Sequence, residues 1–222
     1  MNLRPEIIFI TLVVLAFSLS FHEMAHAWTA DKLGDPTARQ LGRVSMNPVV
    51  HVDPIGTILF PLLSMVMAGL AAGAGYRVGF IGWAKPVPIQ VRNLSRPRRD
   101  VILIALAGPA SNILLAVVIA LIWRLLAFAP AIDQSLAQPV AAFLVIGLLS
   151  NLGLAIFNLL PIPPLDGFGV LESLLPRSLA PLAFQLRRYG MLVLLVIMMT
   201  GVLGRILGPA QRAILDLLLG RH

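Results

Sequence analysis

The chain has 222 residues, of which 58% are hydrophobic and 12% are charged, and its mean hydropathy is +0.89. A soluble domain is nearer to half apolar and a quarter charged, so this composition excludes an ordinary soluble protein and indicates one embedded in lipid. The net charge of +7 would suit a nucleic-acid binder, but the basic residues lie mostly in loops between apolar stretches, as membrane orientation requires, so we expect no nucleic-acid partner.

Four apolar stretches reach the roughly 20 residues that a membrane-crossing helix needs. They cover residues 5–30, 101–129, 139–160 and, approximately, 188–207. The first stretch also has features of a cleaved signal peptide: a basic residue, an apolar run and the small-residue pattern Ala25-His26-Ala27. No polar spacer precedes that pattern, so we interpret the stretch as a retained helix.

A fifth apolar region, residues 54–74, is broken by Pro61, Gly69 and Gly73 and continues toward Pro86. It is compatible with one span plus a re-entrant segment or with a hairpin, and the sequence does not decide between them. We therefore expect an all-α polytopic membrane protein. It would be a bundle of about four to six transmembrane helices with a re-entrant segment and a short extended, β-like cytoplasmic loop.

The chain shows no internal repeat and no linker long enough to separate domains, so we expect one integral-membrane domain over residues 1–222. Its catalytic core would cover about residues 5–167, followed by a C-terminal helix and tail over about 188–222. In the tail, apolar positions combine with Arg212 and Asp216 in the pattern of an amphipathic helix lying on the membrane.

Loop charges predict the orientation of the chain. Residues 77–100 carry six basic side chains, whereas residues 130–138 carry none. Cytoplasmic loops are enriched in Lys and Arg, which places the first loop inside the cell and the second outside. The helix that begins near residue 139 then returns to the inside, so Asp166 would lie near the cytoplasmic face of the cell membrane. The loop at residues 31–53 holds Lys32, Arg39 and Arg43 and is better placed inside than outside, which leaves an even number of crossings, or none, before the next loop.

The end of the first apolar stretch carries His22, Glu23 and His26. Two histidines four positions apart lie about one turn apart on one helix face, so both can bind a single zinc ion, and the adjacent glutamate can reach a water on that ion. Ionisable residues inside a membrane helix are costly and mark functional sites by default. The alternative is a helix end whose polar residues only hydrogen-bond at the interface. It explains one histidine well and the whole group poorly.

A catalytic zinc ion usually has three protein ligands, so a third is needed, and the absence of cysteine restricts it to nitrogen or oxygen. Asp166 is the best candidate, because it follows an apolar helix and a run containing Pro161, Pro163 and Pro164. Such irregular backbone at membrane depth is tolerated only where it lines a cavity or is buried in protein. The alternative is an ordinary proline-rich Asp-Gly turn.

Together these motifs resemble the site-2 protease family of intramembrane zinc metalloproteases, in its compact prokaryotic form. The resemblance covers residues 18–167, about two thirds of the chain. It rests on the segments His22-Glu23-x-x-His26, Asn47-Pro48, His51-Val52-Asp53-Pro54, Gly82-Trp83-Ala84-Lys85-Pro86-Val87-Pro88, Ala107-Gly108-Pro109-x-x-Asn112, Asn158-x-x-Pro161 and Pro164-Leu165-Asp166-Gly167. The chain has no room for the PDZ or nucleotide-sensing domain of larger members, so we do not expect regulation by those modules.

The resemblance implies one zinc ion per chain, bound by His22, His26 and Asp166, with Glu23 as the general base. It also implies that Asn158 steadies the substrate or the oxyanion, a role that suits a buried amide, although helix packing is an alternative.

Two further residues keep open roles. Asn112 is interpreted as a helix cap or a packing residue. His51 is interpreted as a regulatory contact near the active-site mouth or as a plain loop histidine.

The implied activity is zinc-dependent hydrolysis of peptide bonds within or near transmembrane segments of single-pass membrane proteins. Because a helical peptide bond is shielded, the substrate must unwind locally, and residues 36–52 are expected to offer it an extended strand edge. A metal carrier would use the same ligands without needing Glu23. A transporter would need repeat-related broken helices, which the sequence lacks.

Overall fold

The computed structural model describes residues 5–71, 82–127, 134–200 and 202–219. Within these ranges every regular element is a helix, so the expected all-α class is confirmed. The helices that are long and apolar enough to cross a membrane are α1 (Pro5–Lys32), α4 (Pro97–Ala127), α5 (Gln134–Asn158) and α7 (Ala180–Met199). Gly73, and parts of the two loops used above for orientation, lie outside the described residues.

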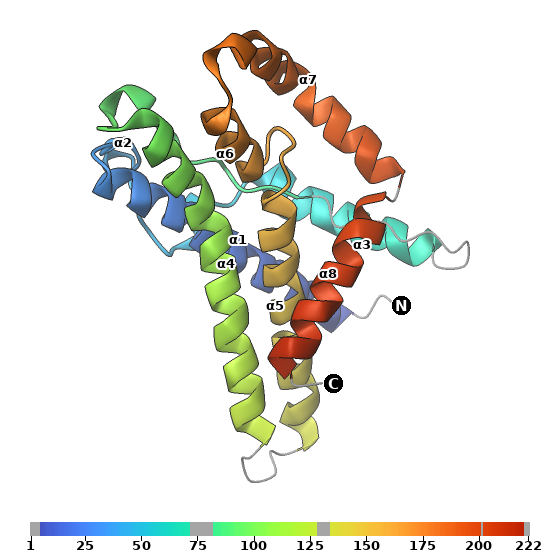
Figure 1. The fold of residues 1–222 in the computed structure, drawn as a ribbon. Helices are drawn as coiled ribbons and strands as arrows, with labels where there is room; N and C mark the ends of the chain where they lie inside the picture. The colour runs from blue at the N-terminus through green and yellow to red at the C-terminus, as the bar shows by residue number, and fades with distance from the viewer. Residues whose placement is uncertain (1–4, 72–81, 128–133, 201, 220–222) are drawn as a thin grey trace.

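The core is formed by α4, α5 and α1. Helices α4 and α5 run side by side in opposite directions, and α1 crosses them (Figure 1). Ala116 and Ala120 of α4 are buried against Leu148 and Leu152 of α5. Small side chains let two backbones approach closely. In lipid the hydrophobic effect does not drive helices together, because the lipid tails are themselves apolar, so this close packing is what favours their association.

The loop after α1 differs from the expected extended segment. Residues 36–52 contain the short helix α2 (Thr37–Gln40) and the 3-10 turn η1 (Pro48–Val50), and no strand. The Asn47 side chain accepts a hydrogen bond from the backbone N–H of Val49, and the following proline presets the turn. The prediction of a strand edge in this segment is therefore wrong, because local capping interactions fold it into turns.

This loop is fastened to the chain that precedes α4. The carboxylate of Asp35, which has no exposed surface, accepts hydrogen bonds from the backbone N–H of Gln90 at 2.6 Å and from Nδ2 of Asn93 at 2.8 Å. Asn93 belongs to the 3-10 turn η4 (Val91–Asn93). The two segments on this side of the bundle are thereby held together.

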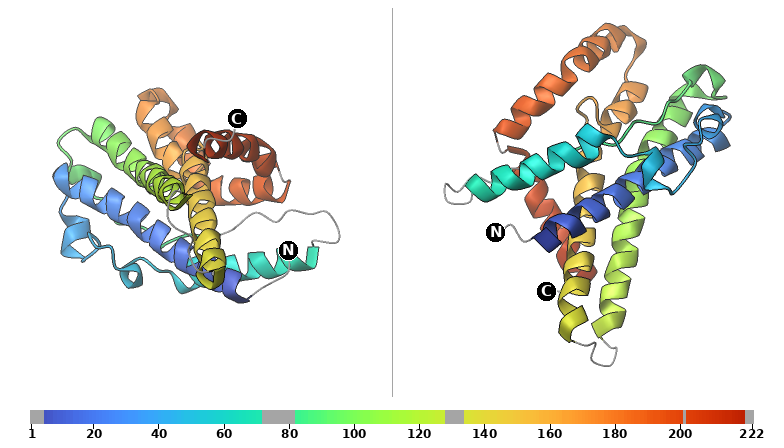
Figure 2. Two further views of the ribbon diagram at one scale, coloured as in Figure 1. Left: turned by 90° about the horizontal axis from the view of Figure 1, so that it is seen from below. Right: turned by 180° about the vertical axis from the view of Figure 1, so that it is seen from behind.

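The fifth apolar region begins with the π-helical turn η2 (Pro54–Leu59) and continues as α3 (Phe60–Ala71), which leaves the bundle beside α1 (Figure 2). At Trp83 the chain is again next to η2, because the Trp83 N–H donates to the carbonyl of Gly56 at 3.1 Å. Gly56 and Trp83 therefore lie side by side, and the expected even number of crossings between them, or none, stays a prediction.

After α5 the chain forms α6 (Asp166–Leu174), the 3-10 turn η5 (Arg177–Leu179) and α7. The last span was expected to extend to about residue 207, but α7 ends at Met199. Thr200 is the C-cap of α7: its N–H makes the last helical hydrogen bond, to the carbonyl of Val196, and its hydroxyl accepts the N–H of Val202 at the start of the next helix. A hydroxyl at this position favours a new helix start over continuation.

Helix α8 (Val202–Leu219) was expected to lie on the membrane surface. Its apolar face packs on the bundle, where Ile214 and Leu215 contact the buried cluster of α4 and α5. Gln211 donates to the carbonyl of Leu149 at 2.7 Å. The place of α8 relative to the membrane stays a prediction.

Candidate metal centre

His22 and His26 lie one turn apart on α1 and are both buried, with 4% and 6% of their surface exposed. Their ring centroids are 4.6 Å apart, and their Nε2 atoms approach to 3.0 Å. The i and i+4 spacing that was read from the sequence therefore places both imidazoles at one point of the helix.

Asp166, the first residue of α6, lies beside the same two imidazoles. Its Oδ2 lies 3.0 Å from Nε2 of His22, and its Oδ1 lies 3.3 Å from Nε2 of His26. In the part of the chain that the structure describes, these three residues form the group whose ligand atoms all lie within 4.8 Å of one another. The carboxylate is thus in place beside both imidazoles.

Gly167 allows the close backbone packing that positions Asp166 beside the two histidines. A Cβ atom at Gly167 would lie 2.2 Å from the carbonyl oxygen of Leu159 and 2.5 Å from that of Leu160. Only glycine allows the first turn of α6 to pack so closely on the backbone that ends α5. The Asp-Gly pair therefore supplies a ligand and the close backbone contact that positions it.

The hydrogen bonds of His22 and His26 indicate which ring nitrogen of each imidazole is free to bind a metal ion. Nδ1 of His26 lies 2.6 Å from the backbone carbonyl of Ile104, and a carbonyl can only accept, so Nδ1 carries a hydrogen, and in the neutral imidazole Nε2 then carries a lone pair. Nδ1 of His22 lies 2.6 Å from Oδ1 of Asn112, which has the same consequence. With both imidazoles neutral, the short contacts to Asp166 are not hydrogen bonds, and its buried Oδ2 has no donor among the described residues.

Three electron-pair donors therefore point at one another without a proton between them. This is unfavourable unless a cation lies among them. Two imidazole nitrogens and one carboxylate oxygen are the donor set of a catalytic zinc site, which leaves a fourth position open for water or substrate. The residues that are present thus fit a zinc ion.

Gly108 of α4 forms one wall of this centre. A Cβ atom at Gly108 would lie 2.4 Å from Nε2 of His26 and 2.6 Å from Nε2 of His22. Neither Gly108 nor Asn112 was predicted from the sequence to lie beside the two histidines. Their spacing of four places them on one face of a helix, and this was the signal that could have found them.

Glu23 follows His22 on α1 and is partly exposed. Its Oε2 accepts a hydrogen bond from the backbone N–H of Val87 at 3.1 Å. Val87 belongs to the irregular segment 82–90, so this segment passes over the carboxylate beside the metal ligands.

Asn158 ends α5 and is partly buried. In the described part of the chain its side chain forms one hydrogen bond, from Nδ2 to the carbonyl of Leu154 in its own helix, at 2.9 Å. The structure therefore does not join Asn158 to the three ligands.

His51 is also outside the group of three. It is 1% exposed, its Nε2 lies 2.8 Å from the carbonyl of Ser45, and its own carbonyl accepts the N–H of Lys85. These contacts fasten the loop after α1 to the segment 82–90.

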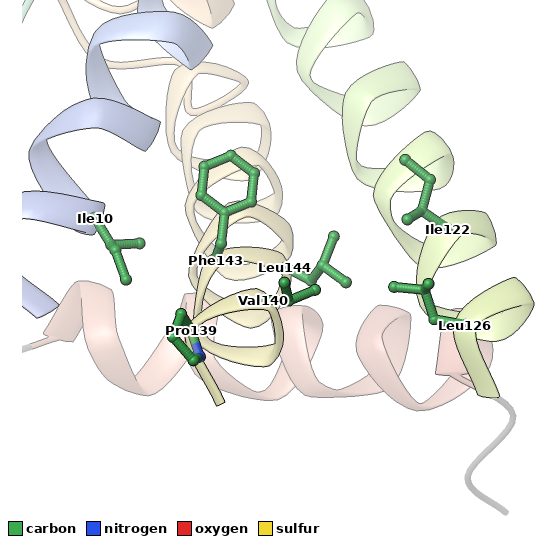
Figure 3. Close-up of a pocket in the computed structure, with 7 residues that line it drawn as sticks. All are labelled: Ile10, Ile122, Leu126, Pro139, Val140, Phe143 and Leu144. Atoms are coloured by element: carbon green, nitrogen blue, oxygen red, sulfur yellow. The ribbon is translucent and has the colours of Figure 1, made fainter. Parts of the chain in front are cut away.

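A separate cavity of about 320 Å³ lies near the start of α1 (Figure 3). Its lining is wholly apolar and comprises Ile10, Ile122, Leu126, Pro139, Val140, Phe143 and Leu144. Ile10 is twelve positions before His22, which is about 18 Å along a helix. The cavity is therefore remote from the metal ligands and offers no group that could take part in chemistry.

Comparison with known proteins extends these observations. The sequence model described as "Peptidase family M50" matches residues 126–201. The chain is 36% identical to the "Putative zinc metalloprotease YwhC" of Bacillus subtilis (strain 168) over 214 residues, which cover 96% of this chain and 89% of that protein. It is 33% identical over 192 residues to the "Putative zinc metalloprotease Rip2" of Mycolicibacterium smegmatis, covering 85% of this chain and 66% of that protein. No solved structure gives a significant match.

Proposed function

The chain belongs to peptidase family M50, and from that premise we propose that His22, His26 and Asp166 bind its catalytic zinc ion and that Glu23 is its general base. The family establishes the activity, which is zinc-dependent endopeptidase action within the membrane. The assignment to residues rests on one observation: three electron-pair donors from α1 and the start of α6 converge within 4.8 Å.

A bound zinc ion would act as a Lewis acid that activates a water molecule and polarises the scissile carbonyl. Glu23 follows the first histidine, so its carboxylate can accept the proton of that water and pass it to the amine that leaves. The Val87 N–H restrains Oε2 of Glu23 and so limits the orientations of the carboxylate. The buried imidazoles and the packed glycine at position 108 exclude bulk water from one side of the centre.

Asn158 is proposed to steady the substrate or the oxyanion. Support comes from its place, eight positions before Asp166 at the end of α5, where, among the described residues, its amide bonds only within its own helix. That bond can be exchanged for one to a substrate carbonyl at little cost, because both partners are amide-type groups.

The proposed substrate is a single-pass membrane protein that is cut near the cytoplasmic face of the cell membrane. His22 lies ten positions before the end of α1, about 15 Å along the helix, and Lys32 at that end is followed by Arg39 and Arg43 in the next loop. Arg92, Arg96, Arg98 and Arg99 are exposed on the same side, before and at the start of α4. Clustered arginines favour the inner leaflet.

The test combines a zinc assay with cleavage of a single-pass model protein in detergent. We expect about one zinc ion per chain, and replacement of His22, His26 or Asp166 by alanine should remove most of it. If Asp166→Ala kept its full zinc content, Asp166 would not be a ligand. Zinc binding without any cleavage would favour a metal carrier.

A further inference from the structure

Three polar side chains meet in the apolar interior where α1, α4 and α5 contact one another. They are Ser18, Asn112 and Asn151, and they are exposed by 3%, 0% and 2%. Burying an amide in a membrane helix is costly unless every polar atom finds a partner. The mechanism above uses none of the three, so their presence needs a separate explanation.

The hydrogen bonds connect these residues to a metal ligand. Nδ2 of Asn151 donates to the carbonyl of Gly147 and to the Ser18 hydroxyl, both at 2.9 Å. Oδ1 of Asn151 accepts from Nδ2 of Asn112 at 2.8 Å. Asn112 also donates to the backbone carbonyl of Ser18 at 3.3 Å, and its Oδ1 lies 2.6 Å from Nδ1 of His22.

The two backbone carbonyls fix the direction of this chain, because a carbonyl can only accept. The amide nitrogen of Asn151 must face Gly147, so its oxygen faces Asn112. The nitrogen of Asn112 must then face Asn151 and the carbonyl of Ser18, so its oxygen faces His22. Nδ1 of His22 must therefore carry a hydrogen, and in the neutral ring the Nε2 lone pair points at His26 and Asp166.

We propose that Asn112 is the residue that positions His22 for zinc, by holding its hydrogen on Nδ1, and that Asn151 keeps Asn112 in the orientation this requires. The inference rests on the proposed function, since it takes zinc as the ion that His22 binds. His26 needs no such pair, because a backbone carbonyl, that of Ile104, already fixes its tautomer. Partners of this kind typically change metal affinity by about 10- to 100-fold.

The test measures zinc affinity by competition with a chelator, and thermal unfolding of the zinc-free protein, for wild type, Asn112→Leu and Asn112→Asp. Leucine cannot accept the His22 hydrogen, so we expect affinity to fall by about 10- to 100-fold. Aspartate can accept it and adds negative charge near the ion, so we expect wild-type affinity or tighter binding. A residue that only packs predicts the reverse order, because a buried carboxylate disturbs packing more than leucine does.

Asn151→Leu tests the second half of the proposal. We expect a smaller loss of affinity than for Asn112→Leu, since the carbonyl of Ser18 still orients Asn112. In the Asn112→Leu background, Asn151→Leu should cause no further loss, because its effect passes through Asn112. Should Asn112→Leu fail to fold, Asn112→Ala takes its place, since alanine also lacks an acceptor.

The proposal is overturned if Asn112→Leu binds zinc within about twofold of wild type, or if Asn112→Asp binds more weakly than Asn112→Leu. Two controls are measured in the same assay: the wild-type protein, which should bind zinc, and His22→Ala, which should not. Failure of that control pair would instead overturn the proposed ligand set. The two failures are therefore distinguishable.

Discussion

The backbone N–H of Val87 donates a hydrogen bond to Oε2 of Glu23 across 3.1 Å. Val87 stands between Pro86 and Pro88, which have no N–H of their own. The N–H groups at positions 83 and 85 also point into the protein, to the carbonyls of Gly56 and His51. The N–H groups of this segment therefore hold it against the body of the protein, and one of them donates to the proposed general base.

Glu23→Gln should abolish cleavage and leave zinc binding unchanged. The Gln carbonyl oxygen can still accept the Val87 hydrogen bond, so the local structure is kept, but an amide cannot take up the proton of the attacking water. We expect turnover to fall by at least about 100-fold, measured as cleavage of a model single-pass substrate alongside a zinc assay. Turnover close to that of wild type would exclude Glu23 as general base.

Gly108→Ala should remove zinc binding. The added methyl group would lie 2.4 Å from Nε2 of His26, inside the space between the imidazoles. Gly153→Ala in α5 is the matched control, because its Cβ would meet no atom closer than 3.6 Å. Both changes raise helix propensity by about 1 kcal/mol, so neither is expected to destabilise its helix through propensity. Normal zinc affinity in Gly108→Ala would show that the ion does not lie between His22 and His26.

Part of this centre follows from the sequence, because it depends on local geometry alone. The spacing of His22 and His26 on one helix needs no knowledge of the rest of the fold. Asp166 was also predicted, since few acidic residues lie next to an apolar helix. The structure brings all three together.

The remaining features depend on how separate helices meet. Asn112 and Gly108 contact the histidines only because α4 crosses α1 at this height, and no local pattern encodes that crossing. Asn151 was missed although a polar residue inside an apolar span is itself a signal of function. The error at residues 36–52 had a local cause, because the capping by Asn47 outweighed the β-branched residues around it.

Substrate choice should depend on how readily the substrate helix unwinds. Opening a helix in lipid exposes backbone groups at several kcal/mol each, and residues 36–52 provide no strand to pair with them. Segment 82–90 recovers little of this cost, since Pro86 and Pro88 cannot donate and the inward N–H groups are occupied.

A Gly-to-Leu series near the cytoplasmic end of one model substrate tests this dependence. Each replacement stabilises the substrate helix by roughly 1 kcal/mol, so cleavage should slow several-fold per step while the cut position stays the same. Rates are measured by gel and cut sites by mass spectrometry. Flat rates, controlled instead by one side chain at the cut, would indicate a sequence-reading pocket.

Asp35 should stabilise the fold down to weakly acidic pH and lose this effect below it. Burial acts to raise the pKa of its carboxyl, but hydrogen bonds from Thr37, Asn93 and the Gln90 N–H outweigh burial and lower the pKa below 3.8. A folded-state pKa below the unfolded value stabilises the fold above the unfolded pKa, and the stabilisation disappears as pH falls through the folded pKa.

Comparison of wild type with Asp35→Asn isolates this contribution. We expect the variant to be less stable by about 1–3 kcal/mol near neutral pH, and the difference to shrink below about pH 4. Thermal unfolding of the zinc-free proteins over a pH series measures it, and groups that titrate equally in both cancel. A difference that grew toward low pH would contradict the prediction.

The order of the site residues along the chain has a consequence for biosynthesis. His22, Glu23 and His26 lie in α1, which the ribosome delivers first, whereas Asp166 follows α5. The residues that hold His22 in place, on α4 and α5, are made in between. If the zinc ligands are those proposed, a nascent chain carries the proposed general base and two histidines without a completed zinc centre. The centre is then complete only after three of the long apolar helices, α1, α4 and α5, have been made.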